Sequence, residues 1–159
     1  MKKLCIILPL ILLFVCNTKD TTDVARKINY YFPENKTACA FVFYDVEAAP
    51  ALTIKDHVVD YHLNEENILT TSSPSDFGWA SEKFSGPRHV YFFNSDGSQI
   101  MDEDKMPLLS NGSVEVDGIE RHYDGLHFSD KEECFSDDSF EDFDIFSELV
   151  REIYKENTR

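Results

Sequence analysis

Basic residues are few in this sequence. It holds 15 lysines and arginines against 30 aspartates and glutamates, and its formal net charge is −15. Lys2 and Lys3 lie in a segment that we expect to be removed, which leaves 13 basic residues against 30 acidic ones and a net charge of −17. A surface of this sign repels the phosphates of nucleic acids and the anionic faces of membranes. The composition therefore argues against a nucleic-acid partner.

The sequence also lacks the motifs of common catalytic sites. It contains no Gly-x-Ser-x-Gly nucleophile motif, no glycine-rich phosphate loop and no Cys-x-x-Cys pair. Paired carboxylates, as at 132–133 and 137–138, are expected from composition alone in so acidic a chain. We therefore predict no catalytic residue, no metal and no cofactor, and the sequence favours a protein that is not an enzyme.

One alternative rests on the histidines. His122 and His127 flank Asp124, and this His/Asp cluster would suit a metal-dependent or other hydrolase. Catalytic zinc normally needs three protein ligands in a defined geometry, and no third ligand stands at a recognisable spacing. His62 and His89 lie within predicted strands, where a packed histidine is commoner than a ligand. A shared cleft with two histidines and a carboxylate would favour the enzyme.

No apolar run is long enough to span a bilayer, which needs roughly 20 residues. A positively charged start is followed by about a dozen apolar residues, so residues 1–15 are predicted to be a signal peptide. Cys16 follows directly, at the position of the lipid-modified cysteine of a bacterial lipoprotein. Residues 16–27 begin with a small, polar stretch that suits a tether between a lipid and a folded domain.

The residues before Cys16 leave a second possibility open. Leu13 fits the lipobox, whereas Val15 stands where a small residue is expected. Ordinary secretion needs small residues three and one positions before the cut, and no Ala-x-Ala site lies nearby. We expect a lipid-anchored protein of the cell envelope, outside the cytoplasm; otherwise the protein is secreted or periplasmic.

Two cysteines remain in the predicted domain after Cys5 and Cys16 are assigned to the signal peptide and the lipid. Cys39 and Cys134 are then one possible disulfide in a compartment that permits disulfides. The alternative is two separate thiols, with Cys39 packed in a strand. A metal site is less favoured, because neither cysteine has ligands at a metal-binding spacing.

Residues 28–159 have the length of one domain, and their pattern is typical of β-structure. Short runs rich in β-branched and aromatic residues alternate with turn formers, and no strand–helix alternation is present. We predict a small antiparallel β-sandwich of seven or eight strands. Both faces of the strand over 37–46 are apolar, so it should be central and covered by a second layer. The predicted strands lie at 28–32, 37–46, 58–63, 68–71, 89–93, 113–116 and 119–123, and short strand candidates lie at 51–54 and 99–101.

The end of the chain predicts one amphipathic helix over residues 139–156. Apolar residues recur there at steps of three and four, acids crowd the start and basic residues gather at the end, as the helix dipole favours. We expect this helix to pack on the sheet. Its apolar stripe consists of Phe143, Phe146, Leu149, Val150, Ile153 and Tyr154.

The loop over 72–79 is the best place for contact with a ligand or partner. It carries Trp79, the single tryptophan, with Phe77 beside it and Phe84 shortly after. The other interpretation, which we favour, is that Trp79 anchors the loop to the core, because large exposed aromatic side chains are uncommon without a partner.

Six short segments occur in a characteristic order, at 31–35, 41–44, 59–63, 68–73, 78–79 and 91–93. Their order resembles an uncharacterised family of bacterial envelope proteins, the domain of unknown function numbered 6843. The sequence departs from the family pattern at 36–38, where a glycine is expected. The resemblance implies an envelope location and a β fold, and it assigns no catalytic residue. The function expected is a non-enzymatic binding or structural module with an unknown envelope partner.

Overall fold

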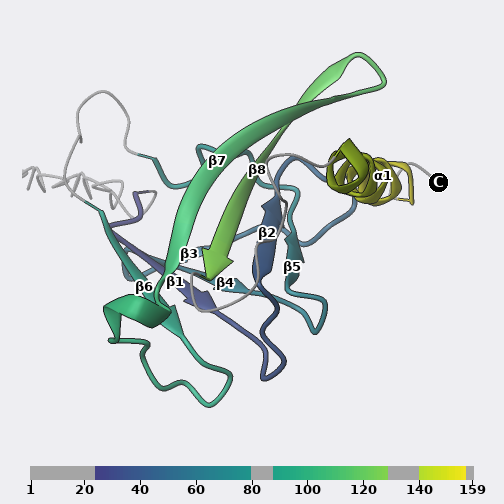
Figure 1. Ribbon diagram of the computed structural model, residues 1–159. Coiled ribbons are helices and arrows are strands. Elements are labelled where there is room, and N and C mark those ends of the chain that lie inside the picture. The colour runs from purple at the N-terminus through teal and green to yellow at the C-terminus, as the bar shows by residue number, and fades with distance from the viewer. Residues whose placement is uncertain (1–23, 80–87, 129–139, 157–159) are drawn as a thin grey trace, which may run out of the picture.

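The structure is a computed structural model, and it describes residues 24–79, 88–128 and 140–156. Figure 1 shows two facing sheets with a helix at the end of the chain. The predicted mainly β fold with one C-terminal helix is confirmed. The elements are β1 (Lys27–Tyr31), β2 (Cys39–Phe43), β3 (Ile54–Lys55), β4 (Val58–His62), β5 (Ile68–Thr70), β6 (His89–Phe93), η1 (Glu103–Lys105), β7 (Pro107–Val116), β8 (Ile119–Phe128) and α1 (Phe140–Glu156).

The chain crosses repeatedly from one sheet to the other. The first sheet has the order β3-β4-β1-β6 and the second has the order β5-β2-β8-β7. β1 leads into β2, and β4 leads into β5, each time in the opposite layer. β1 lies parallel to β4, and β2 lies parallel to β5. β6 also pairs parallel with β1. The prediction of an antiparallel sandwich is therefore wrong for these pairs, since an alternating pattern specifies the buried face and carries no strand direction.

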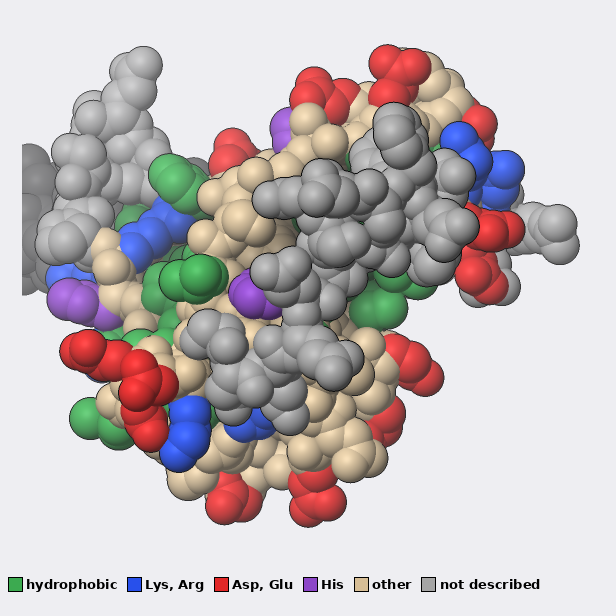
Figure 2. Space-filling view, viewed as in Figure 1, with side chains coloured by type: hydrophobic (Ala, Val, Ile, Leu, Met, Phe, Trp, Pro, Cys, Tyr) green, Lys and Arg blue, Asp and Glu red, His purple; other side chains and the backbone are tan. Residues whose placement is uncertain are grey.

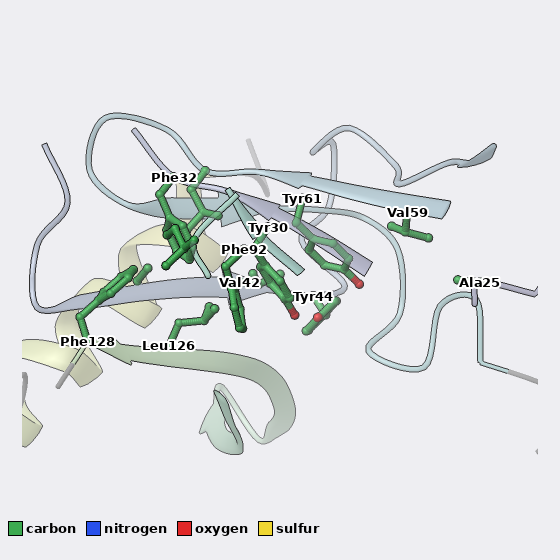
Figure 3. Close-up of a cluster of buried hydrophobic side chains, with 13 residues drawn as sticks. Ala25, Tyr30, Phe32, Val42, Tyr44, Val59, Tyr61, Phe92, Leu126 and Phe128 are labelled. Carbon is green, nitrogen blue, oxygen red and sulfur yellow. The ribbon is translucent and has the colours of Figure 1, made fainter. Parts of the chain in front are cut away.

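The larger core lies between the two sheets. Figure 3 shows aromatic and aliphatic side chains from both layers meeting there, with Phe128 at one end and Ala25 at the other. Ala40 and Val42 of β2 belong to this core, whereas Phe41 and Phe43 belong to a second apolar cluster on the opposite face. The prediction that β2 is central and covered on both faces is confirmed.

Helix α1 supplies the third layer. Among its described side chains, those of Phe146, Val150 and Tyr154 are buried, and they pack with Phe43 and Val116 on the outer face of the second sheet. The predicted helix at 139–156 matches α1, apart from Ser139, which lies outside the described residues. The described members of the predicted stripe face the sheet, and the side chain of Phe143 is outside the described set.

The hairpin of β7 and β8 is longer than predicted. Asp117 and Gly118 both have positive φ, 53° and 77°, as expected for the two-residue turn read from the sequence. Each arm, however, contains ten residues. Residues 107–111, which lie outside every predicted strand, are strand because they pair with β8 from Phe128 back to Asp124.

The ordered domain begins before the predicted position 28. Ala25 is buried at 2% exposure, and its N–H donates to the carbonyl of Gly78 at 2.9 Å. The last residues of the predicted tether, 16–27, are therefore part of the domain. Residues 1–15, Cys16, Phe84 and Cys134 lie outside the described residues, so the predictions for them stay predictions. Within the described segments, no helix has the length and apolar character needed to cross a membrane.

Candidate functional site

A pocket of about 280 Å³ joins the loop over 72–79 to the hairpin of β7 and β8. We call it the Asp124 pocket, because Asp124 is the buried charged side chain among its described lining residues. Residues from both predicted sites, Trp79 of the loop and the His122–Asp124 pair, line it together. The lining residues are Ser75, Asp76, Trp79, Asn111, Gly112, His122, Tyr123 and Asp124.

The strand register places Asp124 between the sheets. It has the same parity on β8 as the core residues Leu126 and Phe128, and it is 8% exposed. Its Oδ2 accepts hydrogen bonds from the hydroxyls of Tyr44 at 2.6 Å and Tyr30 at 3.3 Å.

The other oxygen of Asp124 has a single donor. Asn111 Nδ2 donates to Oδ1 at 2.5 Å. A carboxylate has about four acceptor positions. Donors among the described residues occupy three of them, which leaves one for a ligand.

Burial determines the protonation of this cluster. It raises the pKa of Asp124, against the opposing effect of the hydrogen bonds from Tyr44, Asn111 and Tyr30. It also raises the pKa values of the Tyr30 and Tyr44 hydroxyls, and the nearby charge of Asp124 adds to the rise. Both phenols therefore stay protonated and act as donors. All three hydrogen bonds to Asp124 thus come from groups that do not titrate near neutral pH.

Gly112 and Tyr123 form one wall of the pocket. These residues are opposite each other in the β7–β8 pairing, and a Cβ on Gly112 would lie 2.4 Å from Cζ of Tyr123. The tyrosine ring thus lies over the glycine, and the Cβ of any other residue at position 112 would clash with the ring. The same ring packs on Phe146 of α1 with centroids 5.0 Å apart, which connects the wall to the helix.

Trp79 is 63% exposed, so the expectation that it anchors the loop is wrong. Phe77 takes that role, as a half-buried residue packed on the main core. One face of the Trp79 ring is covered by the guanidinium of Arg88, 4.0 Å from the ring centroid. The cation–π contact holds the indole at the surface beside the pocket.

The histidines do not gather into one site. His122 lines the pocket, but His127 has the opposite parity on β8 and pairs with Cys39. His57 Nδ1 lies 3.0 Å from the carbonyl of Val24, while His62 stacks on Tyr31. Among the described residues, no three histidines, cysteines or carboxylates are placed to hold a metal.

Cys39 is disulfide-bonded in this structure. The predicted partner, Cys134, is not among the described residues, so the pairing of these two cysteines remains a prediction.

A larger hollow, of about 810 Å³, lies between the segments 33–36 and 94–105. Its charged and polar groups are largely engaged with one another. Lys105 pairs with Asp102 at 3.0 Å, and Lys36 donates to Asn94. The Lys105–Asp102 pair is exposed and contributes little to stability, whereas the Lys36–Asn94 contact is partly buried. Among the described lining residues, no buried charged side chain is directed into this hollow. The Asp124 pocket is therefore the stronger candidate.

Sequence reasoning missed the residues that hold Asp124. Tyr30 and Tyr44 look like ordinary strand aromatics, and they lie 94 and 80 residues from the aspartate. Asn111 falls in a run of turn formers that lies outside the predicted strands. No local signal connects these residues, because the contact depends on the pairing of β8 with β2 and β7.

Comparison with known proteins gives one similar fold. No family model matches the chain, so the resemblance to the domain family numbered 6843 has no support there. No curated protein matches either. The fold is similar to the crystal structure of a protein from Bacillus anthracis described as a "Putative Lipoprotein", with a TM-score of 0.60 and 17% sequence identity. The match covers 87% of this chain and 98% of that one, so the two share the fold over nearly their whole lengths.

Proposed function

We propose that this chain is an exported, lipid-anchored cell-envelope protein that binds a small ligand in the Asp124 pocket without acting on it chemically. The signal-like residues 1–15 and the cysteine at 16 support export and anchoring. The similar fold of a protein described as a lipoprotein agrees with them.

The binding role rests on one observation, the buried Asp124 carboxylate that lines a pocket beside an exposed tryptophan. Ligand sites combine a concave surface with a few convergent polar groups. A carboxylate that three donors hold in place is already oriented before a ligand arrives, which lowers the entropy cost of binding.

The lining residues select a ligand that carries hydrogen-bond donors. Asp124 and Asp76 contribute acceptors, and the Trp79 ring offers an apolar face. An amine or a hydroxylated ring with an aliphatic face satisfies both requirements, and a cation would also gain from the rings. An anionic ligand is disfavoured by the two carboxylates.

We propose that the pocket binds its ligand without catalysis because of the groups that hold Asp124. Two phenols and an amide hold it, and none of them is a base that would activate a nucleophile at neutral pH.

The anchor is tested by the intact mass of the mature protein recovered from the membranes of its host, beside a Cys16→Ala variant. A diacylglyceryl mass that disappears in the variant supports the anchor. An unlipidated wild-type protein in the soluble fraction would contradict it.

The ligand site is tested by thermal unfolding of the purified protein with panels of amines, amino acids and monosaccharides. A ligand that binds the folded state raises the unfolding temperature. The rise should vanish in Asp124→Asn and persist in Asp117→Asn, the same change at the exposed hairpin turn. A rise that survives Asp124→Asn would place binding elsewhere.

A further inference from the structure

Basic side chains gather at the end of the first sheet where β1 begins. His89, Lys27, Val58 and Lys55 lie in one row across β6, β1, β4 and β3. Figure 2 shows lysine, arginine and histidine side chains together at its left edge, the side on which β1 begins in Figure 1.

Two arginines extend this group. The N–H of Arg26 donates to the carbonyl of His57 at 2.8 Å, and its own carbonyl accepts from the N–H of His89 at 3.0 Å. Arg88 precedes β6 and lies on Trp79. We call Arg26, Lys27, Lys55 and Arg88 the basic end.

The sign of this surface is opposite to that of the chain. The described segments that form it contain four cationic side chains and two acids, Asp56 and Asp76, and Asp60 follows further along β4 with a hydrogen bond to Asn29. The chain as a whole carries −15. Exposed acids outnumber basic side chains over the rest of the described surface, so the basic end is a local cationic patch on an acidic molecule. These acids include Glu103 and Asp104 in η1, Glu115, Asp117 and Glu120 at the hairpin tip, and Glu148 and Glu152 on α1 beside Arg151 and Lys155.

The basic end is also the end at which the chain enters the domain. Val24 and Ala25 lie there, with Ala25 bonded to Gly78, the neighbour of Trp79. Only the eight residues 16–23 separate Val24 from the predicted lipid on Cys16. Fully extended, they span at most about 30 Å. A lipid at Cys16 therefore keeps this end of the domain close to the membrane.

Trp79 suits the same surface. It is exposed, and its ring is held on Arg88 next to the point of chain entry. Tryptophan favours the boundary between membrane and water, because its ring is apolar and its N–H is a donor.

We propose that the basic end binds the anionic headgroups of the membrane that carries the anchor and turns α1 and the hairpin tip away from it. This orientation rests on the proposed lipid anchor. Lysine and arginine near an anionic membrane contribute about 1 kcal/mol each, whereas the acidic remainder of the surface is repelled. Contact through the basic end is thus the orientation that this local cationic patch favours.

The test uses the emission of Trp79, the single tryptophan of the chain. The mature lipoprotein is purified from host membranes and reconstituted into vesicles of brominated phosphatidylglycerol, whose bromine atoms quench a nearby indole. We expect quenching that decreases severalfold in about 1 M salt, where the screening length is only roughly 3 Å, and in vesicles of brominated phosphatidylcholine.

The variant Lys27→Gln/Lys55→Gln should lose the quenching in the same way. Arg151→Gln/Lys155→Gln, which removes two charges from α1, should keep it. Quenching that is absent, equal in neutral lipid, or equally reduced by both pairs of substitutions would overturn the proposal.

The lipid anchor and the membrane-binding basic end are tested independently. If the mass of the mature protein shows no lipid, the anchor is wrong, and the surface is tested by sedimentation of the unlipidated protein with phosphatidylglycerol vesicles. Loss of binding by roughly tenfold or more in Lys27→Gln/Lys55→Gln would support the basic end, at about 1 kcal/mol for each lysine. No sedimentation of the wild type would overturn it.

Discussion

The hydroxyl of Tyr154 donates to the main-chain carbonyl of Tyr44 across 2.7 Å, and the hydroxyl of Tyr44 in turn donates to Asp124. Two hydrogen bonds thus connect α1 to the carboxylate that lines the pocket. The helix is therefore part of the support of the site as well as a cover for the second sheet.

Tyr154→Phe removes the first of these bonds and keeps the ring that packs edge-on against Phe43. The Tyr44 carbonyl is left without this donor, so we expect a loss of about 1 kcal/mol in the free energy of unfolding. Urea denaturation measures it. An unchanged midpoint and slope would show that the bond contributes nothing to stability.

Tyr154 should also make the stability of the protein depend on pH. Burial raises the pKa of Tyr154 to about 12, above its ordinary value of 10.0. The unfolded chain therefore loses this proton first, so stability is retained below pH 10 and falls between about pH 10 and 12. Tyr154→Phe should fall less steeply in this window. Parallel curves for the two proteins would contradict the assignment.

Asp124 should make the stability of the protein depend on pH in the acidic range. Burial raises its pKa in the folded state, so folding favours the protonated form. Its contribution is greatest below the unfolded pKa and is lost as pH rises through the folded one. As pH falls from 7 toward 4, the wild type should gain stability relative to Asp124→Asn, which has no such proton. Chemical denaturation at several pH values measures the difference, and a constant difference would contradict the prediction.

Several parts of the fold follow from sequence patterns. The two apolar faces of β2 predicted layers on both sides, and the three- and four-residue spacing of Phe146, Val150 and Tyr154 predicted the packed face of α1. These signals are local, since each depends on the period of one element. The period of two in a strand gives no direction, which is why the parallel pairing of β1 with β4 and β6 was missed.

The site was predictable only in pieces. Trp79 and Asp124 were each singled out, but their meeting in one pocket depends on where the loop over 72–79 lies relative to β8. Asn111 was missed because the run Ser110-Asn111-Gly112 consists of turn formers. It is held as strand by the ladder with β8, a tertiary effect that overrides local preference.

The exposed and buried aromatics of the loop should differ sharply in stability. Trp79→Ala removes a 63% exposed ring and should change the free energy of unfolding by no more than about 0.5 kcal/mol. Phe77→Ala removes a ring packed on the core and should cost about 2 kcal/mol or more. Urea denaturation of both variants decides which residue anchors the loop, and the reverse order would restore Trp79 to that role.

Gly112 should tolerate no larger residue while Tyr123 is present. In Gly112→Ala the new methyl group meets the Tyr123 ring at 2.4 Å, so the ring must move from its place against Phe146. We expect a loss of about 1–3 kcal/mol, measured by urea denaturation. Ser113→Ala, at the exposed neighbouring position, serves as the control and should be near neutral. In Tyr123→Ala the obstacle is gone, so adding Gly112→Ala should then cost much less. A double-mutant cycle gives this coupling energy, and additive costs would mean that the ring and the glycine do not constrain each other.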